Sequence, residues 1–358
     1  MKIIIAGGGT GGHLFPGIAV AEEFLRRNRE NGILFIGTER GLEKKVLEKS
    51  GFKLCILDVE GIKGRGWIKI FGALSKIPRS LLQSYRIIGR FRPDIVVGVG
   101  GYASGPAVIT AHFMGIRTAI MEQNAFPGMT NRILGKFADR IFLTFSDTKK
   151  WFPETKTIVC GNPVRSAFLT EIPDTKKMGG KFTILVFGGS QGAHAINKAV
   201  TNALPYLKEI GERIRIIHQT GEKDLDSVLT NYKEYDMDAE VVPFIMDMAA
   251  AYRSSNLLIC RAGATSIAEI TASGKAAILV PFPFAVNDHQ TKNADVLVRA
   301  QAAVMIHEKD LNGQKLAETI GYLYQHPHII KEMEENSSRL GNIRAASDIV
   351  DACEKMCI

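Results

Sequence analysis

The sequence predicts an α/β protein built from two Rossmann-like domains in tandem, each around a parallel β-sheet. Short apolar runs alternate with helical stretches of roughly ten to fifteen residues, which is typical of parallel α/β folds. An apolar strand, a glycine-rich turn and a helix open the chain, and the same order returns in KFTILVFGGSQGAHAINKAV at 181–200. The length of 358 residues also exceeds one ordinary core and fits two domains.

The N-terminal half begins with a strand at 2–6, the turn AGGGTGGHLFPG at 6–17 and a helix at 16–28. Pro16 suits an early helical position, because proline lacks the N–H that a first turn leaves unpaired. Further apolar runs that end in glycine or in polar residues predict more strands at 33–37, 94–100 and 117–123.

The C-terminal half repeats this alternation. After the strand that starts at 181, the sequence predicts further units at 213–221, 239–245, 256–264 and 275–284. The polar stretch GNPVRSAFLTEIPDTKKMGGK at 161–181 contains two prolines and a Gly-Gly pair, as linkers often do. The expected segments are an N-terminal domain at 1–162, a linker at 163–180, a C-terminal domain at 181–340 and a last segment at 341–358.

The composition excludes several classes of protein. With 46% hydrophobic and 23% charged residues, the chain is expected to be globular and soluble. The uncharged stretch 95–116 contains VGVGGYASGP, whose four glycines and one proline predict a strand, a turn and a helix instead of a membrane span. The five cysteines form no CxxC pair, which indicates reduced thiols in a cytoplasmic protein. The net charge of +8 favours anionic partners.

Four loops carry the candidate chemistry. A glycine loop before a helix lets backbone N–H groups approach an anion, and the helix dipole adds about half a positive charge. Gly7-x-Gly9-x-x-Gly12 formally matches the dinucleotide fingerprint, with Glu39 as a late ribose acid. The alternative is a merely tight turn, against which five glycines in six positions argue strongly. GGSQGA at 188–193 offers a hydroxyl and an amide to a phosphate or a sugar.

The other two loops follow later strands. CRAGATSIAE at 260–269 opens a helix suited to a pyrophosphate, with Glu269 able to accept ribose hydroxyls; helix capping is the alternative for this acid. PFPFAVNDHQTKNA at 281–294 carries polar side chains at the carboxyl end of a strand, where such folds bind ligands.

Eight motifs occur in the order found in one known family. They are GGGTGGH at 7–13, GGYASGP at 100–106, EQN at 122–124, GNPVR at 161–165, GGSQGA at 188–193, PFI-DM around 243–248, RAGATSIAE at 261–269 and DHQTKNA at 288–294. The chain resembles the MurG family, bacterial N-acetylglucosaminyltransferases that make the last lipid-linked precursor of peptidoglycan. The resemblance implies a GT-B fold, in which two Rossmann-like domains face an interdomain cleft and the C-terminal helix usually returns to the N-terminal domain.

The resemblance further implies that UDP-N-acetylglucosamine binds mainly to the C-terminal domain. Ile245 would hold the uracil edge through its backbone, with Phe244 beside it, and Glu269 would accept the ribose hydroxyls. The other donor ligands would bind the diphosphate or the sugar. They are Arg165, Ser190, Ala264 and Thr265 for the diphosphate, and His289, Gln290, Asn124, Thr10, Gly11 and Gly12 for the sugar.

The implied reaction joins the anomeric carbon of N-acetylglucosamine to the 4-hydroxyl of the acceptor's N-acetylmuramic acid and expels UDP with inversion. It needs a base for the hydroxyl and stabilisation for the leaving diphosphate. His13 is the candidate base, because imidazole titrates near neutral pH; the alternative is that it only holds the loop or the acceptor phosphate. Where the family usually has histidine before EQN, this chain has Met121, which removes one candidate.

The acceptor is the lipid-linked muramyl-pentapeptide, whose pyrophosphate would face the first glycine loop and GGYASGP. Its ligands would be Gly9, His13, Gly101, Tyr102, Ser104, Glu122 and Gln123. No metal or other cofactor is expected beyond the substrate itself. Asp224-Leu-Asp226 and Asp236-Met-Asp238 look like the metal-binding DxD of other glycosyltransferases, but they lie in a charged, helix-like stretch and are expected to be solvated.

A basic stretch predicts contact with a membrane. Residues 61–92 contain eight Lys or Arg and no acid. The remaining apolar residues beside this charge favour docking on anionic lipid, to which each basic residue adds about 1 kcal/mol. We expect peripheral attachment to the cytoplasmic side of the cell membrane, and a soluble basic helix is the alternative. Six apolar residues at helical spacing are expected in the core: Trp67, Phe71, Leu74, Leu81, Tyr85 and Ile88.

Further partners expected are proteins of cell-wall synthesis. Nucleic acid is not expected, because the basic stretch carries no recognised binding motif. Three rival functions remain. They are a nicotinamide-dependent oxidoreductase, which rests on the lone fingerprint, a UDP-N-acetylglucosamine 2-epimerase or another GT-B transferase, and a nucleotide-binding module without enzymatic activity.

Overall fold

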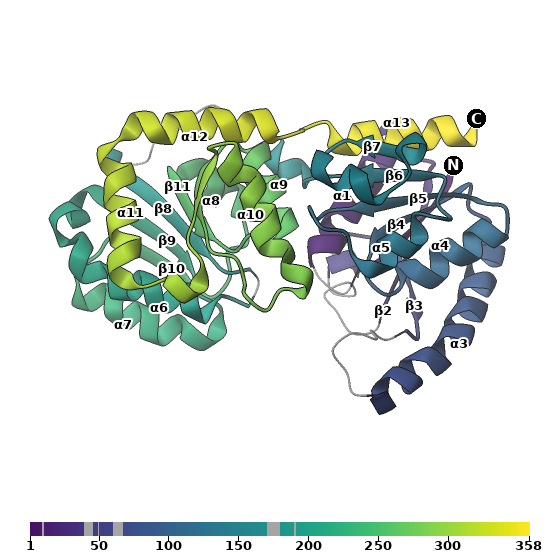
Figure 1. The fold of residues 1–358 in the computed structure, drawn as a ribbon, viewed down its shortest axis with the longest axis horizontal. Coiled ribbons are helices and arrows are strands. Elements are labelled where there is room, and N and C mark those ends of the chain that lie inside the picture. Colours follow the sequence, from purple (N-terminus) through teal and green to yellow (C-terminus); the bar gives the residue numbers. More distant parts are fainter. Residues whose placement is uncertain (9–10, 39–45, 49, 60–66, 170–179, 190) are drawn as a thin grey trace. The chain divides into compact units, whose positions relative to one another are not determined.

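The computed structural model describes residues 1–8, 11–38, 46–48, 50–59, 67–169, 180–189 and 191–358, with the backbone alone at 67–76 and 286. These residues form two compact units: Met1–Arg165 with Asn342–Ile358, and Ser166–Gly341. Each unit contains one parallel β-sheet with helices on its faces, so the predicted fold class is confirmed (Figure 1). Most of the predicted linker, 170–179, lies outside the described residues, and the predicted cleft stays a prediction.

The sheet of the N-terminal unit has seven strands in the order β3-β2-β1-β4-β5-β6-β7, all parallel. The central strands β1 and β4 are almost wholly buried, because helices cover both faces of a parallel sheet. The strand bounds are β1 Lys2–Gly7, β2 Gly32–Thr38, β3 Lys53–Leu57, β4 Ile95–Gly100, β5 Arg117–Glu122, β6 Arg140–Leu143 and β7 Thr157–Val159.

Around this sheet lie α1 Gly11–Arg27, α3 Trp67–Phe91, α4 Ser104–Phe113, α5 Met129–Leu134 and α13 Ala345–Cys357. The prediction for the first helix was wrong by one turn and more, since α1 begins at Gly11 and not at Pro16. Proline inside a helix removes one backbone hydrogen bond, and here it does so close to the N-terminus, where the loss is smallest.

The uncharged stretch 95–116 is the strand β4, a glycine turn and the helix α4, as the sequence predicted. Among the described helices, none has the length and apolarity that crossing a bilayer would require.

The C-terminal helix α13 packs on the N-terminal unit. Arg27 of α1 forms ion pairs with Asp351 at 2.6 Å and with Glu354 at 2.7 Å. Because the Arg27 side chain is only 19% exposed, these pairs are partly shielded from water and stronger than ordinary surface pairs. The apolar face of α13 completes the core beside β1 and α1 through Ile349, Val350 and Cys353.

The helix α3 buries a different face from the one predicted. Ile88 is fully buried as expected, and Leu81 is half-buried, but Tyr85 is 57% exposed. The buried stripe runs through Ser80, Ser84 and Ile88, which are spaced by four residues, so Tyr85 lies about 100° around the helix from Ser84. The side chains of Trp67, Phe71 and Leu74 lie outside the described residues.

The sheet of the C-terminal unit has six parallel strands in the order β10-β9-β8-β11-β12-β13. Their bounds are β8 Phe182–Phe187, β9 Ile214–Gln219, β10 Ala239–Val242, β11 Leu257–Cys260, β12 Ala276–Leu279 and β13 Ala303–Met305. The helices are α6 His194–Ala203, α7 Leu225–Glu234, α8 Met248–Ser254, α9 Ala264–Ala272, α10 His289–Arg299, α11 Gly313–Gln325 and α12 Pro327–Leu340.

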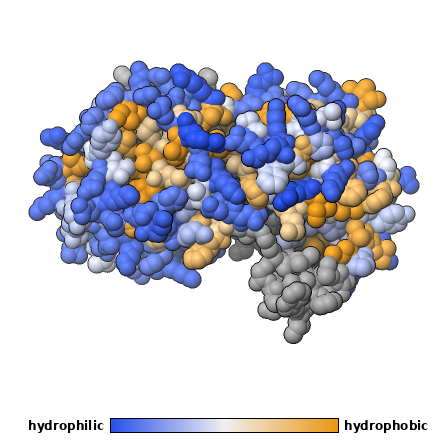
Figure 2. All heavy atoms as spheres, viewed as in Figure 1, coloured by the Kyte–Doolittle hydropathy of each residue, from blue (hydrophilic) through white to orange (hydrophobic). Residues whose placement is uncertain are grey.

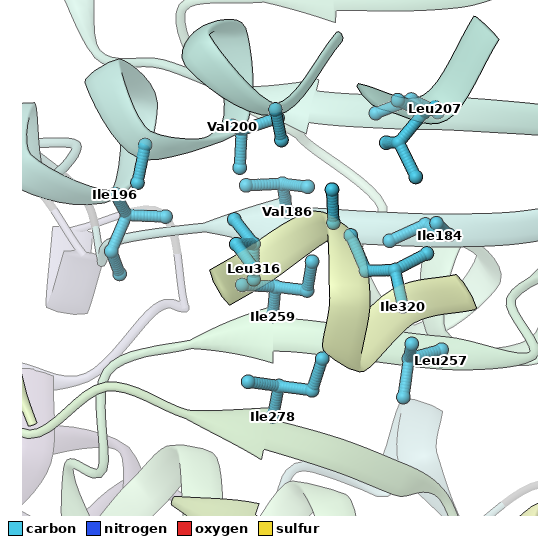
Figure 3. Close-up of a cluster of buried hydrophobic side chains, with 14 of the residues drawn as sticks. Ile184, Val186, Ile196, Val200, Leu207, Leu257, Ile259, Ile278, Leu316 and Ile320 are labelled. Carbon is cyan, nitrogen blue, oxygen red and sulfur yellow. The ribbon is translucent and has the colours of Figure 1, made fainter. Parts of the chain in front are cut away.

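One apolar cluster joins this sheet to two of its helices. Alternate side chains of the central strands point to the same face of the sheet, where α6 and α11 meet them (Figure 3). The labelled members are Ile184, Val186, Leu257, Ile259 and Ile278 from strands, Ile196, Val200, Leu316 and Ile320 from the two helices, and Leu207 from the 3-10 helix after α6. This core fixes the carboxyl ends of the strands, from which the candidate loops emerge.

Candidate active site

In the N-terminal unit, the loop after β1 touches the loop after β4 backbone to backbone. Gly7 has φ +144° and Gly101 has φ +80°, and a Cβ on either would collide with the backbone of the opposite loop, at Gly100 and Gly8 respectively. The Gly8 N–H donates to the Gly100 carbonyl at 3.2 Å. Only glycine permits this approach, so these glycines of the two motifs pack the loops together whatever else they bind.

His13 stands in the first turn of α1, directly after this crossing, and is half-buried. Its Nδ1 lies 3.0 Å from Oε1 of Gln123, and the Gln123 Nε2 donates to the Val99 carbonyl at 3.0 Å. Because the amide of Gln123 turns its oxygen toward the ring, Nδ1 must carry the hydrogen. The neutral imidazole then keeps Nε2 as a lone-pair acceptor, which is what a general base requires.

Two predicted acceptor ligands, Glu122 and Gln123, are committed to the protein. Glu122 is 2% exposed, and its carboxylate accepts from the backbone N–H of Asn124 and of Gly128 and from Nδ2 of Asn131, all at 2.9–3.0 Å. Gln123 is 1% exposed, and both ends of its amide are occupied. Direct binding of an acceptor by these residues stays a prediction, and in this structure their side chains hold the loops after β5 and β4. Asn124, a predicted sugar ligand, is itself held by Glu122.

Two further positions in this unit are buried. Ser104, predicted to bind the acceptor, is fully buried at the start of α4, and its role stays a prediction. Met121 is 2% exposed and belongs to the core, so the side chain at this position faces the interior of the protein. Tyr102 is 50% exposed and remains available. Gly11 and Gly12 form the start of α1, whereas Gly9 and Thr10 lie outside the described residues.

Arg165, predicted to bind the diphosphate, is the last residue of the first chain segment of the N-terminal unit. Its guanidinium lies over the ring of Phe15, 4.9 Å from the centroid, which is a cation–π contact. Phe15 follows His13 by two residues on α1, so the contact ties the end of this segment to the helix that carries the histidine.

In the C-terminal unit, two loops again meet backbone to backbone. Gly192 and Gly221 both have positive φ, and a Cβ on either would collide with the opposite loop, at Thr220 and Gln191. Ser190 lies outside the described residues. The next loop along the edge contains Phe244, which is 50% exposed, and Ile245.

The backbone of Ile245 is only partly available to uracil. Its N–H donates to Oε1 of Gln219 at 2.8 Å, and Nε2 of the same amide donates to the Gly189 carbonyl at 2.9 Å. The N–H of Ile245 is thus already bonded within the protein, and its backbone contact with uracil stays a prediction. Gln219 belongs to none of the eight motifs, although a polar residue that ends an apolar strand is a signal for such a role.

Two helix starts complete this edge. The helix α9 begins at Ala264 after an extended Gly263, with Thr265 half-buried beside it and Glu269 only 5% exposed. The helix α10 begins at His289 after Asn287 and Asp288, which both adopt left-handed backbone conformations, at φ +57° and +54°. Adjacent non-glycine residues in this region are strained, as is common where a loop serves a ligand.

Arg261, which follows β11 and was given no role from the sequence, holds the loop between β12 and α10. The Arg261 guanidinium donates to the carbonyls of Val280 and Pro281, pairs with Glu308 and lies 5.3 Å from the centroid of the Phe282 ring. Gln290, a predicted sugar ligand, accepts from the Phe282 N–H at 3.0 Å, so its carboxamide oxygen also organises this loop.

The two DxD-like tripeptides do not form one site. Asp224 is more than a solvated residue: its side chain is 17% exposed and accepts from Asn197 at 2.8 Å and from His194 at 3.0 Å. Asp238 pairs with Lys181 at 3.0 Å, and Asp226 and Asp236 are exposed. In the described part of the chain, no group of three or more His, Cys, Asp or Glu side chains is arranged to hold a metal ion.

Comparisons with known proteins agree along the whole chain. The glycosyltransferase family 28 N-terminal domain matches residues 3–143, and the C-terminal domain of that family matches residues 183–352. A UDP-N-acetylglucosamine–N-acetylmuramyl-(pentapeptide) pyrophosphoryl-undecaprenol N-acetylglucosamine transferase of Syntrophus aciditrophicus is 63% identical over 356 residues, 99% of each chain. The crystal structure of Acinetobacter baumannii MurG is 31% identical, with a TM-score of 0.80 and 99% of each chain covered.

The epimerase alternative shares the fold alone. The UDP-GlcNAc 2-epimerase of Neisseria meningitidis, solved bound to UDP-GlcNAc, has a TM-score of 0.69 but only 15% identity, over 99% of this chain and 100% of that one. Identity of 63% over nearly the full length is of a different order. The chain belongs to the MurG family of N-acetylglucosamine transferases, within glycosyltransferase family 28.

Proposed function

We propose that the protein transfers N-acetylglucosamine from UDP-N-acetylglucosamine to the 4-hydroxyl of undecaprenyl-pyrophosphoryl-N-acetylmuramyl-pentapeptide, the step from lipid I to lipid II in peptidoglycan synthesis. The observation that carries this proposal is the 63% identity, over 99% of both chains, to a relative whose name states this transfer. The glycine loops and helix starts at the carboxyl edge of both sheets support it, because they supply backbone donors for two pyrophosphate groups.

His13 is the proposed base. Its Nε2 takes the proton of the muramyl 4-hydroxyl while the hydroxyl oxygen forms a bond to the anomeric carbon and the bond from that carbon to the diphosphate oxygen breaks. One displacement of this kind inverts the anomeric configuration. The hydrogen bond from Nδ1 to Gln123 supports the role, because it holds the ring in the tautomer whose Nε2 is unprotonated.

The C-terminal unit is proposed to hold the donor. The start of α9 with Thr265 and the loop with Ser190 bind the diphosphate and, with Arg165, stabilise its charge as UDP leaves. Glu269 accepts the ribose hydroxyls, Ile245 meets the uracil beside Phe244, and the start of α10 reads the sugar. Helix N-termini and Arg165 are proposed to stabilise the diphosphate without a metal ion.

The experiment is UDP release from UDP-N-acetylglucosamine, with and without a short-chain lipid-linked muramyl-pentapeptide, in EDTA. Release that depends on the acceptor and resists EDTA is the expected outcome. Formation of the 2-epimer without acceptor, with or without release of UDP, would favour the epimerase. UDP binding with neither release nor epimer formation would favour a nucleotide-binding module. A requirement for added divalent metal would overturn the metal-free part of the proposal.

Peripheral binding to the cytoplasmic leaflet is part of the same proposal. Leu82 is 50% and Tyr85 57% exposed on α3, beside the exposed Arg86 and Arg90. Phe113 at the end of α4 is 75% exposed, and Figure 2 shows apolar side chains gathered over this part of the N-terminal unit. Apolar groups among basic residues insert into an anionic interface, where the polyprenyl acceptor resides.

Sedimentation with vesicles tests this surface. The L82S/Y85S variant should bind phosphatidylglycerol vesicles less tightly, and wild-type binding should weaken as salt is raised. The matched control is Y206S/Y322S, which removes side chains of similar exposure, 60% and 53%, from the C-terminal unit. Equal loss of binding in both double variants would show that the surface on α3 is not the docking face.

A further inference from the structure

Gln219 ends β9, the strand that lies between β8 and β10 in the sheet of the C-terminal unit. It is 1% exposed, and its carboxamide forms hydrogen bonds with the loops that follow both neighbouring strands. Nε2 donates to the carbonyl of Gly189, in the loop after β8, and Oε1 accepts from the N–H of Ile245, in the loop after β10. One side chain thus spans the loop proposed to bind the diphosphate and the loop proposed to bind the uracil.

The turn that carries Gln219 is itself fixed. The N–H groups of Thr220 and Gly221 donate to the carbonyls of Val242 and Pro243, at 3.0 and 3.1 Å, which joins the turn to the β10 side. On the other side, Nδ2 of Asn197 donates to the Thr220 carbonyl at 2.9 Å. Because this turn is held on both sides, the Gln219 carboxamide keeps the Gly189 carbonyl and the Ile245 N–H at a constant separation.

We infer that Gln219 is a positioning residue that sets the spacing between the uracil-binding and diphosphate-binding loops before the donor arrives. This inference rests on the proposed function. A uridine diphosphate has its base and its diphosphate at opposite ends of one ribose, so it binds best when the two loops already stand at the matching distance. Ordering them in advance lowers the entropic cost of binding.

The chemistry of the side chain limits what can replace it. The two contacts need one donor and one acceptor on a single planar group, which glutamine provides. Glutamate keeps the acceptor for Ile245 but, when ionised, sets an oxygen against the Gly189 carbonyl. Methionine fills a similar volume and makes neither hydrogen bond. The two substitutions therefore break one contact and both contacts, respectively.

The test measures donor KM, acceptor KM and kcat by UDP release, and the UDP Kd by calorimetry, for Q219M and Q219E. We expect Q219M to raise the donor KM and the UDP Kd about tenfold, with the acceptor KM and the kcat at saturating donor within about threefold of wild type. Q219E should raise the donor KM and the UDP Kd at least as much, because it places a buried carboxylate against the Gly189 carbonyl. If Q219M does not fold, the same shift in Q219E carries the test.

The matched control is N256L. Asn256 is 8% exposed, and its side-chain oxygen accepts from the Thr183 N–H at 2.9 Å, at the opposite edge of the same sheet. The N256L variant loses a buried hydrogen bond from a side-chain amide to the backbone, as Q219M does. The lost bond is far from the loops proposed to bind uracil and diphosphate. N256L should lower the melting temperature without changing the UDP Kd.

The outcomes separate the two proposals. A raised UDP Kd in Q219M but not in N256L supports the positioning role, even if wild type transfers nothing to the lipid acceptor. Equal UDP Kd in wild type, Q219M and Q219E overturns it, even if transfer occurs as proposed. A fall in kcat at saturating donor with an unchanged donor KM also overturns it, because a residue that only spaces the binding loops acts on donor affinity.

Discussion

The two units begin with the same order of elements, but the first histidine of each has different surroundings. In each, a central strand leads through a glycine loop into a helix with a histidine in its first turn, His13 in α1 and His194 in α6. His13 is half-buried against the amide of Gln123, whereas the His194 side chain is 78% exposed and pairs with Asp224. The difference comes from a third element. Gln123 follows β5, and the strand in the corresponding place, β12, is followed by Val280 and a proline instead.

A glycine loop followed by a histidine is therefore not by itself a catalytic motif. The histidine becomes a candidate base only where a buried polar group from two strands away fixes its tautomer. In the C-terminal unit the buried amide of Gln219 holds two backbone groups, and that of Asn197 holds the Thr220 carbonyl, Asp224 and the buried His218. The exposed His194 pairs with Asp224 instead.

Exchanging either histidine for alanine would test the contrast most strongly. His13→Ala should lower kcat by about 10² to 10⁴, the usual contribution of a general base, with the UDP Kd unchanged. His194→Ala should change kcat by less than about threefold, because its exposed ion pair contributes little. The measurement is acceptor-dependent UDP release for the two variants side by side. A kcat for His13→Ala within about tenfold of wild type would reduce the residue to holding the loop or the acceptor.

A smaller loss should follow from moving His13 without removing it. Gly100 has φ +94°, and a Cβ there would fall 2.6 Å from Nδ1 of His13. Gly100→Ala should therefore displace the ring from Gln123 and lower kcat by up to about 10², as misplacement by an ångström can do. The control is Gly115→Ala, at φ +73° with open space around it, which carries the backbone strain alone. Equal kcat in both variants would mean that the position of the ring is not critical.

The sequence predicted the fold better than it predicted the direction of side chains. Most of the buried strands were found, because a parallel sheet leaves long β-branched runs. Four strands of three to five residues were missed: β3, β6, β7 and β13, of which β6 is buried. The start of α1 was misplaced because proline was taken for a boundary, although one lost bond near the end of a helix is tolerated.

The candidate site was predicted as a set of loops, not as a set of contacts. A motif tells that Glu122, Gln123 and Ser104 stand at strand and helix ends, but not that all three turn inward and are buried. Burial depends on neighbours distant in the chain, such as Asn131 for Glu122 and Val99 for Gln123. Gln219 and Arg261 were overlooked for the same reason, since their partners follow other strands of the sheet.

The smallest expected effect concerns a third histidine, His218, and the pH dependence of the free energy of unfolding. His218 of β9 is fully buried, with Nδ1 at 2.9 Å from the Tyr232 hydroxyl and Nε2 at 3.1 Å from Oδ1 of Asn197. Burial lowers the pKa of His218 to about 3. In the unfolded chain a histidine titrates near 6.5, so below about pH 6.5 the unfolded state binds a proton that the folded state refuses. The free energy of unfolding should then fall by about 1.4 kcal/mol for each pH unit below about 6.5.

His218→Gln removes this titration, so the change in unfolding free energy from about pH 7.5 to about pH 5.5 should be smaller than in wild type by roughly 1.4 kcal/mol. Hydrogen exchange of β8 and β9 in urea measures it within the C-terminal unit. Asp224 does not interfere: burial opposes its ionisation, but hydrogen bonds from Asn197 and His194 lower its pKa, so its contribution is lost only below about pH 4. Identical pH dependence in both proteins would mean that His218 is not held neutral. The expected pattern is that His13→Ala lowers kcat, whereas His218→Gln changes the pH dependence of the unfolding free energy and leaves kcat unchanged.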